Sequence, residues 1–302
     1  MRAVFHAGEL AVQAREGVVD QARRLSGMIG DRFPDDARAF FAEQRLVVVA
    51  TVDDETGEVW ASFLSGARGF ASVVGPRQLT IRADAAGGDP LARTLRDEGP
   101  MGLLAIEPAT RRRMKAKGRA QRTPDGYALE AASVYSLCPK YIQARELALE
   151  AKALGAPGAP EANEHAALTL AEQAWIARAD TAFLATWSTG GGPDASHRGG
   201  APGFLRVISP THLAFPDYAG NNMFNSLGNL ALSPRAGLSI LDYETGATLA
   251  LSGSAEASWD PAELRVLAGA RRVVHLTIRR VVEIRAAHPA PWRFLGASRF
   301  NP

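Results

Sequence analysis

The chain has 302 residues, of which 46% are hydrophobic and 22% are charged, and this composition is typical of globular proteins with a sizeable core. Lys and Arg number 34 against 32 Asp and Glu, so the formal net charge of +2 gives no reason to expect a nucleic-acid binder. A single cysteine, Cys138, excludes an intrachain disulfide framework and every site built from several cysteines. Collagen-like, coiled-coil and disulfide-rich secreted classes are therefore excluded.

The N-terminal sequence MRAVFHAGELAVQAREG is interrupted by charges at Arg2, Glu9 and Arg15, which is unlike a signal peptide. The longest strand-like apolar run, Leu46–Val52, is much too short to cross a bilayer. We therefore expect a soluble, cytoplasmic protein with no membrane partner. The sequence has no P-loop, no Rossmann fingerprint and no nucleophile elbow, and its six histidines are scattered, so we expect no metal site.

After an N-terminal extension over residues 1–34, the predicted elements follow the same order twice. A short amphipathic helix is predicted over residues 35–44 and again over 164–178, each followed by an apolar strand, VVVATV or AFLATW. A glycine-bearing turn, strands around QLTI or HLAF, a helix, and a strand GLLAI or GLSIL come next. Short strands at such spacing, with Gly and Pro between them, indicate an antiparallel barrel or sandwich.

The two halves also match residue by residue. Ala61–Arg82 and Ala195–Pro216 are identical at nine of 22 positions with a constant offset of 134. Such a repeat indicates a duplicated fold. We expect one repeat over residues 35–150, a Pro- and Gly-rich linker over 151–163, and a second repeat over 164–302.

The second repeat, with SHRGGAPGFLRVIS, HLAFPDY and NNMFNSLGNLALS, resembles the FMN-binding split barrels related to pyridoxamine 5′-phosphate oxidase. The whole chain resembles a longer branch of that family through FHAGELAVQAREGV, RRRMKAKGRA and CPKYIQ. The resemblance implies a mainly β fold, a β-barrel with flanking helices, in which two tandem Greek-key split barrels form a pseudo-dimer. In the family, FMN lies in a groove between two barrels that usually come from two subunits.

A flavin phosphate needs arginine and hydroxyl, amide or backbone donors. The resemblance places Arg198 where the family's second strand offers an arginine, and the asparagine-rich segment after Tyr218 opens a helix, whose N-terminus favours anions. The alternatives are a solvated loop arginine and asparagines that only cap the helix. From the second repeat, the resemblance implies these cofactor-binding residues: Ser196, His197, Arg198, Gly199, Phe215, Asp217, Tyr218, Asn222, Asn225 and Ser226.

The first repeat has Leu64 in place of the arginine and adds Asp89 near the asparagine-equivalent segment, so we infer that its phosphate site is lost. It can still contribute across the groove. The resemblance points to Arg113 in the basic strand and to Cys138, Lys140 and Tyr141 as further cofactor contacts.

The basic run RRRMKAK offers two interpretations. On a strand, Arg111, Arg113, Lys115 and Lys117 share one face, which suits a ligand groove, but charges also guard solvated edge strands. Cys138 is equally consistent with a small buried hydrophobe. In the extension, the spacing of His6, Glu9 and Gln13 is consistent with one face of a helical lid or with a capped surface helix.

The function implied is an FMN-dependent oxidoreductase that transfers a hydride to or from a small organic substrate, with catalytic residues not assigned. Electrons would come from NAD(P)H or a separate reductase. A non-catalytic flavin or haem carrier, or a deazaflavin-dependent reductase, stays open as an alternative because the fold does not choose between them. A homodimer also stays open.

Overall fold

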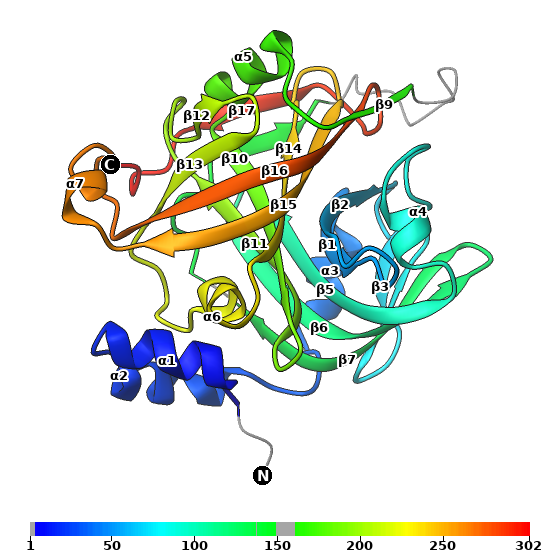
Figure 1. The fold of residues 1–302 in the computed structure, drawn as a ribbon. Coiled ribbons are helices and arrows are strands. Elements are labelled where there is room, and N and C mark those ends of the chain that lie inside the picture. The colour runs from blue at the N-terminus through cyan, green and yellow to red at the C-terminus, as the bar shows by residue number, and fades with distance from the viewer. Residues whose placement is uncertain (1–3, 137, 149–160) are drawn as a thin grey trace.

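Two large antiparallel sheets form the computed structural model, which describes residues 4–136, 138–148 and 161–302 (Figure 1). The first sheet is built from the first half of the chain. Its strands, in order across the sheet, are β2 (Val59–Ser65), β1 (Leu46–Val52), β5 (Glu98–Glu107), β6 (Arg112–Thr123), β7 (Gly126–Ser136), β4 (Gln78–Ile81) and β3 (Ala71–Val73).

The second sheet is built from the second half of the chain. Its strands, in order, are β11 (Gly192–Gly199), β10 (Thr181–Ser188), β14 (Arg235–Leu241), β15 (Thr248–Ser258), β16 (Arg272–Ile284), β13 (His212–Asp217) and β12 (Arg206–Ser209). When the strands of the two halves are matched in chain order, both sheets have the same strand order. The mainly β prediction is confirmed.

Local irregularities also match between the sheets. A register shift falls between Lys117 and Gly118 in β6, and another between Ser252 and Gly253 in β15. A Cβ atom on Gly118 would lie 2.0 Å from the carbonyl oxygen of Glu130, and one on Gly253 would lie 1.9 Å from that of Thr277. Only glycine fits either position, because the neighbouring backbone occupies the space of a side chain.

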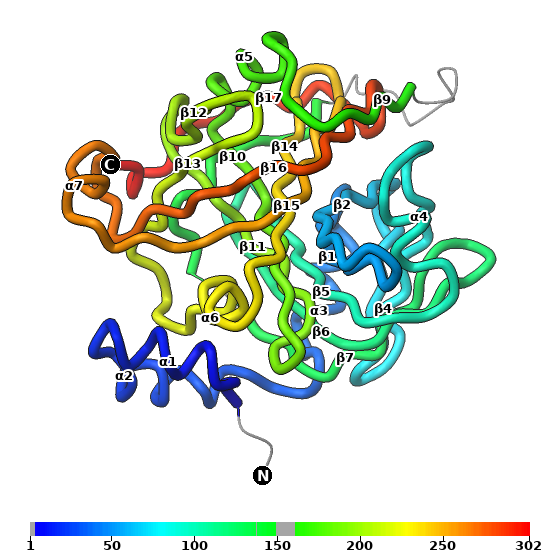
Figure 2. Tube along the Cα trace, viewed as in Figure 1, coloured from blue at the N-terminus to red at the C-terminus, as the bar shows by residue number. Residues whose placement is uncertain are grey.

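The helices lie around these sheets. The extension forms α1 (Ala7–Arg15), α2 (Val19–Leu25) and the 3-10 turn η1 (Ser26–Met28); the first half adds α3 (Ala37–Ala42) and α4 (Leu91–Thr94); the second half adds α5 (Leu170–Arg178), α6 (Asn225–Leu232) and α7 (Pro261–Leu264). Figures 1 and 2 show α1 and α2 beside α6, away from the other helices. None of the described helices is long and apolar enough to cross a membrane.

Most of the predicted linker, 151–163, lies outside the described residues, but its last residues differ from the prediction. Ala162 begins strand β9 (Ala162–His165), which pairs with Val281–Ile284 of β16, beyond the stretch that pairs with β13. The predicted helix 164–178 therefore starts later, at Leu170, where Thr169 and Glu172 form a capping box. A small separate sheet joins β8 (Ala144–Leu147) to β17 (Trp292–Gly296).

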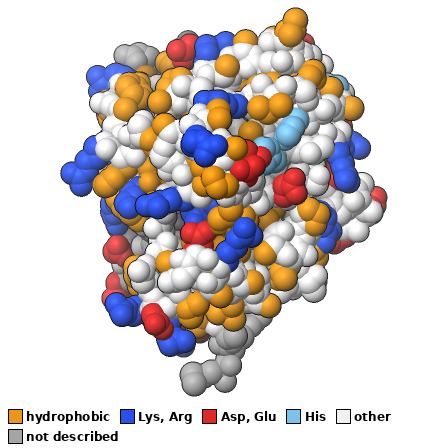
Figure 3. All heavy atoms as spheres, turned by 60° about the vertical axis from the view of Figure 1, so that its left-hand side comes forward, with side chains coloured by type: hydrophobic (Ala, Val, Ile, Leu, Met, Phe, Trp, Pro, Cys, Tyr) orange, Lys and Arg blue, Asp and Glu red, His pale blue; other side chains and the backbone are white. Residues whose placement is uncertain are grey.

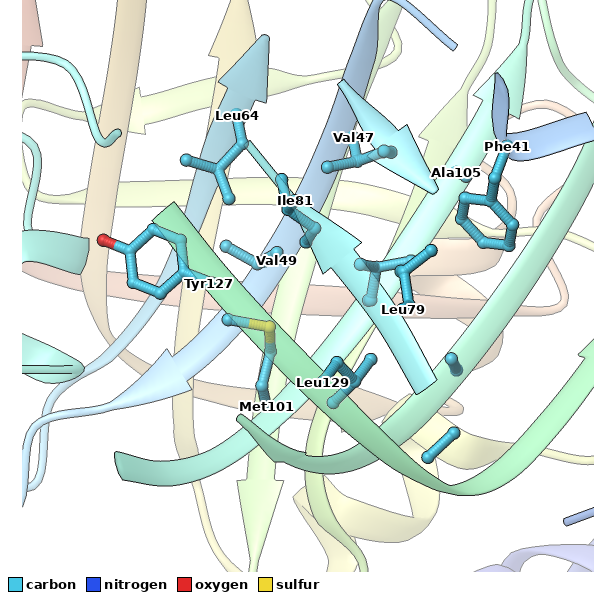
Figure 4. Packing of buried hydrophobic residues seen from close by; sticks show 14 of the residues in the cluster. Phe41, Val47, Val49, Leu64, Leu79, Ile81, Met101, Ala105, Tyr127 and Leu129 are labelled. Carbon is cyan, nitrogen blue, oxygen red and sulfur yellow. The ribbon is translucent and has the colours of Figure 1, made fainter. Parts of the chain in front are cut away.

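Each half has its own hydrophobic core, because alternate strand residues point to the inside of each curved sheet. In the first half, Phe41 of α3 packs with Val47, Leu79 and Leu129 (Figure 4). The second core contains residues such as Leu184, Phe215 and Leu249.

A third core joins the two halves. Val48, Ala50 and Phe63 of the first half pack against Phe183 and Ala195 of the second, and the rings of Phe63 and Phe183 meet edge to face at 5.3 Å. This shared core brings β6 close to β11, and the site described next lies there.

Candidate functional site

A cavity of about 130 Å³, open to solvent, lies between the two halves. The second half contributes the end of β11, the end of β13 and the first turn of α6, and the first half contributes β6 and the segment that follows β7. The cavity is lined by twelve of the residues predicted from the sequence: Arg113, Lys140, Tyr141, Ser196, His197, Arg198, Gly199, Asp217, Tyr218, Asn222, Asn225 and Ser226.

Two predicted residues do not line this cavity. Phe215 is fully buried in the core of the second half, so its placement does not support the predicted cofactor contact. Cys138 is partly buried and close enough to Arg113 to influence its charge, but it is not part of the cavity wall.

The predicted set also missed several residues that line the cavity: Lys115, Pro216, Gly220, Asn221, Phe224, Leu227 and Arg272. Lys115 follows Arg113 by two residues on β6, so the alternation of side chains along a strand could have identified it. Nothing in the sequence pointed to Arg272, which reaches the cavity because β16 lies beside β13 in the sheet.

Arg198 and Arg272 share one carboxylate. Arg198 Nη1 lies 2.5 Å from Asp217 Oδ1, and Arg272 Nη2 lies 2.7 Å from Asp217 Oδ2. The other amino group of Arg272 lies 2.7 Å from Glu16 Oε2, which comes from the end of α1. Two arginines are therefore fixed in the cavity wall by two carboxylates. The net charge of these four side chains, Arg198, Asp217, Arg272 and Glu16, is zero.

Arg113 has no such partner among the described residues. Its Nε is buried without a hydrogen-bond acceptor, and so are Nε of Arg198 and Nε2 of His197. Burial lowers the pKa of Arg113 to about 10, and the nearby Arg198 contributes in the same direction. Three unsatisfied nitrogen atoms from both halves thus lie at one cavity, a cost that an acceptor in the cavity would remove.

His197 is held in its neutral form. Burial lowers the pKa of its imidazole well below the ordinary value, and the charges of Arg113 and Arg198 add to this effect. At neutral pH, His197 therefore offers the cavity a hydrogen-bonding ring without a charge.

Asp194 is the centre of a buried polar network that joins the halves. Its carboxylate accepts hydrogen bonds from Lys115 (2.6 Å), Ser196 (2.8 Å) and Ser226 (3.0 Å), and Lys117 Nζ lies 3.3 Å away. Burial alone would raise the pKa of Asp194, but the two lysines hold it well below its usual range. Burial in turn lowers the pKa of Lys115 to about 8, against the attraction of Asp194.

This network decides between the two interpretations of the basic run. β6 lies inside the sheet, between β5 and β7, so the interpretation as an edge strand is wrong. Arg113, Lys115 and Lys117 face the second half, as their alternation predicts. Arg111 does not join them, because it lies in the preceding turn with a φ of 61° and donates to the carbonyl oxygen of Ile142.

The first turn of α6 forms part of the cavity wall. Its N-cap residue, Phe224, has a left-handed φ of 59°, and no side chain caps the helix. The backbone N–H groups of this turn are therefore available to an anion, which the helix dipole favours.

The two asparagines predicted as anion ligands have other partners. Asn225 donates to Glu9 of α1 and accepts from the hydroxyl of Tyr135, while Asn222 donates to Gln21 of α2. Their amides hold α6 and the segment before it against the extension, and the helix backbone, rather than these side chains, offers donors to the cavity.

Helix α1 packs directly on α6. His6 caps α1, and Glu9 and Gln13 are buried on the face toward α6, where Gln13 donates to the carbonyl oxygen of Met223. A Cβ atom on Gly8 would lie 2.0 Å from the carbonyl oxygen of Gly228, so the two helices meet where both lack side chains. The helix is capped, as the alternative of a capped surface helix predicts, but its face with Glu9 and Gln13 is buried rather than exposed.

Figure 3 shows the side of the molecule that carries α7 and the C-terminus, where Lys and Arg side chains lie among hydrophobic ones. Near the cavity, the rings of Tyr141 and Tyr218 lie 4.9 Å apart with 31° between their planes. The hydroxyl of Tyr141 donates to the carbonyl oxygen of Ala219, which fixes this aromatic wall beside the arginines.

Comparison with known families gives one match, which covers part of the chain. Residues 168–288, which supply β11, β13 and α6, match the model of the family named Pyridoxamine 5′-phosphate oxidase. These residues form a domain of that family. No curated protein matches the chain.

Solved structures similar to this chain include HupZ of Group A Streptococcus, with 13% identity, 41% of this chain and 99% of that one covered, and a TM-score of 0.33. A putative pyridoxamine 5′-phosphate oxidase of Lactobacillus delbrueckii has 23% identity, coverages of 38% and 93%, and a TM-score of 0.32. The FAD binding protein of Mycobacterium smegmatis has 14% identity, coverages of 40% and 99%, and a TM-score of 0.29.

Proposed function

We propose that the cavity binds flavin mononucleotide and that the protein is a flavin-dependent oxidoreductase acting on a small organic molecule. The observation that carries the proposal is the set of unsatisfied buried nitrogens of Arg113, Arg198 and His197 around one cavity. A buried guanidinium without a counter-ion is costly, and an anionic ligand with several acceptors would offset that cost.

The residues present fit the two ends of such a ligand. Arg198, Arg272 and the uncapped first turn of α6 would hold a phosphate, because they combine guanidinium groups that Asp217 holds in place with free backbone N–H groups. Arg113, the neutral imidazole of His197 and the tyrosine pair would face a flat ring with acceptor atoms at its edge. When bound, the flavin supplies the hydride acceptor and donor, and the chain supplies orientation and charge. Electrons would come from NAD(P)H or a separate reductase.

We also propose that the chain is a tandem of two split barrels, over residues 35–150 and 164–302, related by a pseudo-twofold axis. The equal strand order and the matching bulges support this. The contacts between the halves support it as well: Gly102 lies against the carbonyl oxygen of Pro193, and its counterpart Gly237 lies against that of Val59. Such reciprocal contacts are the mark of a twofold interface.

The first experiment is a titration of the purified protein with FMN and, separately, with riboflavin, which lacks the phosphate, followed by flavin absorbance. Arg198→Ala should weaken FMN binding at least tenfold and reduce the preference for FMN over riboflavin. Arg113→Met should weaken both ligands to a similar extent, because Arg113 would face the ring. Arg119→Ala is the matched control, because Arg119 is an exposed residue of β6, the strand that carries Arg113. It should change the affinity for neither FMN nor riboflavin.

Three results would contradict the proposal: no flavin binding, binding that neither variant changes, or a purified protein that carries haem or a deazaflavin when its released cofactor is identified by mass. If FMN binds, anaerobic addition of NADPH or NADH should bleach the flavin. A flavin that stays oxidised with both donors would point to a separate reductase or to a carrier without catalysis.

A further inference from the structure

We infer that the chain binds a single ligand, and that the equivalent groove of the first half has become a permanent packing contact. This inference rests on the proposed tandem arrangement and on the proposed function of the cavity. The two halves meet at two places, which we call crossings. At the cavity, β11 lies against β5 and β6, and at the other crossing β2 lies against β14 and β15. The inference concerns this other crossing.

The sheet register fixes which residues correspond. Gly102 of β5 pairs with Lys117 of β6, and Gly237 of β14 pairs with Ser252 of β15, so Ala250 stands where Lys115 does. Gly102 touches Pro193, and Gly237 touches Val59, so the residues that follow, Asp194 and Trp60, are counterparts.

The two crossings are filled in opposite ways. At the cavity, Asp194 and Lys115 form a buried ion pair of 2.6 Å. At the other crossing, Trp60 is fully buried and packs in one cluster with Ala250, Val282 and Ile284. The large indole fills the space in front of a small residue, and packing of Trp60 takes the place of the Asp194–Lys115 ion pair. The guanidinium of Arg93 lies 5.1 Å from the centre of the indole ring, and the buried Nε1 of Trp60 has no hydrogen-bond partner among the described residues.

The first half also lacks donors at the positions that correspond to His197 and Arg198. Along β2, Phe63 and Leu64 take the places of His197 and Arg198, as the pairing of β2 with β1 and of β11 with β10 shows. Phe63 contributes to the core between the halves and Leu64 to the core of its own half. Neither side chain can hold a phosphate.

In the first half, the carboxylate of Asp89 lies at the position that corresponds to the phosphate site proposed in the second half. α4 holds the place of α6 in the chain order, and at its first residue the N–H of Leu91 donates to Asp89 Oδ1 at 2.8 Å. The same oxygen accepts from Ser62, the counterpart of Ser196, at 2.5 Å. In front of this turn, a Cβ atom on Gly88 would lie 2.2 Å from Cβ of Ala162, so strand β9 closes over it.

The test is the stoichiometry of FMN, titrated into protein at a concentration far above the dissociation constant. We expect saturation at one FMN per chain. Arg198→Leu, which copies the residue of the first half, should weaken binding at least tenfold, and Leu64→Arg should not add a second site because Trp60 and Asp89 still fill the groove. Two FMN per chain, or an unchanged affinity in Arg198→Leu, would overturn the inference.

A second readout does not depend on flavin. If the groove is a packing contact, Trp60→Ala should lower the melting temperature by roughly 10 °C, whereas Leu170→Ala, at a side chain that is 83% exposed, should change it little. An unchanged melting temperature in Trp60→Ala would overturn the inference. Absence of FMN binding combined with a large loss in Trp60→Ala would instead reject the proposed function and leave the packing contact supported.

Discussion

Arg113 and Arg198 show how side chains of one type acquire different tasks from their surroundings. Arg198 shares Asp217 with Arg272, so its charge is balanced before any ligand arrives. Arg113 has no carboxylate partner among the described residues, and its unsatisfied Nε is the stronger sign of a missing ligand. A buried ion pair such as Asp194 with Lys115 adds little net stability, but it fixes how the two halves meet.

Asp89 gives the stability of the protein a specific dependence on pH. Burial raises the pKa of its carboxyl to about 6, although the hydrogen bonds from Ser62 and Leu91 oppose this, and in an unfolded chain the pKa is about 3.9. Between these values the folded state holds a proton that the unfolded state releases. The resulting stabilisation, up to about 3 kcal/mol, is complete below pH ~4 and is lost as the pH rises through about 6.

Asp89→Asn should remove that loss, because an amide oxygen can still accept from Ser62 and Leu91 but carries no charge. In urea unfolding, we expect the variant to gain stability over the natural chain at pH 7.5 relative to pH 4.5. The control is Asp54→Asn at an exposed turn. An equal difference at both pH values would show that Asp89 is not responsible.

At the level of single residues, the sequence predicted the site best where a motif marks a segment of backbone that lines the cavity. The Ser196-His197-Arg198-Gly199 stretch lines the cavity because the end of β11 does. The partners of Asn222 and Asn225 were harder to predict, because their amides bind residues of the N-terminal extension more than 200 positions away. No local pattern predicts such a partner, and the burial of Phe215 likewise depends on the curvature of its sheet.

Helix α1 is the element that fixes the first turn of α6. Its capping box is visible in the sequence, so its presence could be predicted, but its partner could not. The contact between α1 and α6 depends on two glycines, Gly8 and Gly228, that lie 220 positions apart. Glu9 and Gln13 then add hydrogen bonds across the same contact.

Gly8→Ala tests this contact. In a helix interior the change would ordinarily stabilise by about 1 kcal/mol, but here the new Cβ would meet the backbone of Gly228, so we expect a net loss of about 1–3 kcal/mol. The shift of α1 should also weaken FMN binding, because Glu9 would no longer hold Asn225 beside the cavity. Gly27→Ala, where nothing lies within 4 Å of the new atom, is the control. A more stable Gly8→Ala protein would contradict the tight contact.

For the whole molecule, the interface between the halves has two similar crossings with different contents. The repeat in the sequence predicted two similar sets of elements, and the structure has two sheets of equal strand order. Which crossing contains a cavity depends on a few side chains, notably Asp194 against Trp60 and Lys115 against Ala250. The loss of Arg from the first half was visible in the sequence, but the indole that fills its groove was not.

Gly102→Ala and Gly237→Ala form a matched pair that separates the two crossings. Each new Cβ would lie within 2.6 Å of a carbonyl oxygen across the interface, so both variants should melt at a lower temperature. Only Gly102→Ala should weaken FMN binding, because its contact adjoins Asp194, whereas that of Gly237 adjoins Trp60. The measurements are thermal unfolding and FMN titration. Equal effects of the two variants on FMN affinity would contradict this asymmetry.

Both walls of the cavity belong to one polypeptide, with Arg113 on one and Arg198 on the other. A pocket shared by two separate subunits is lost when the protein is diluted below the concentration at which the subunits dissociate. Here the covalent chain keeps each wall at a fixed effective concentration near the other. Occupancy of the cavity should therefore follow the supply of ligand alone, and it should be the same when the protein is scarce as when it is abundant.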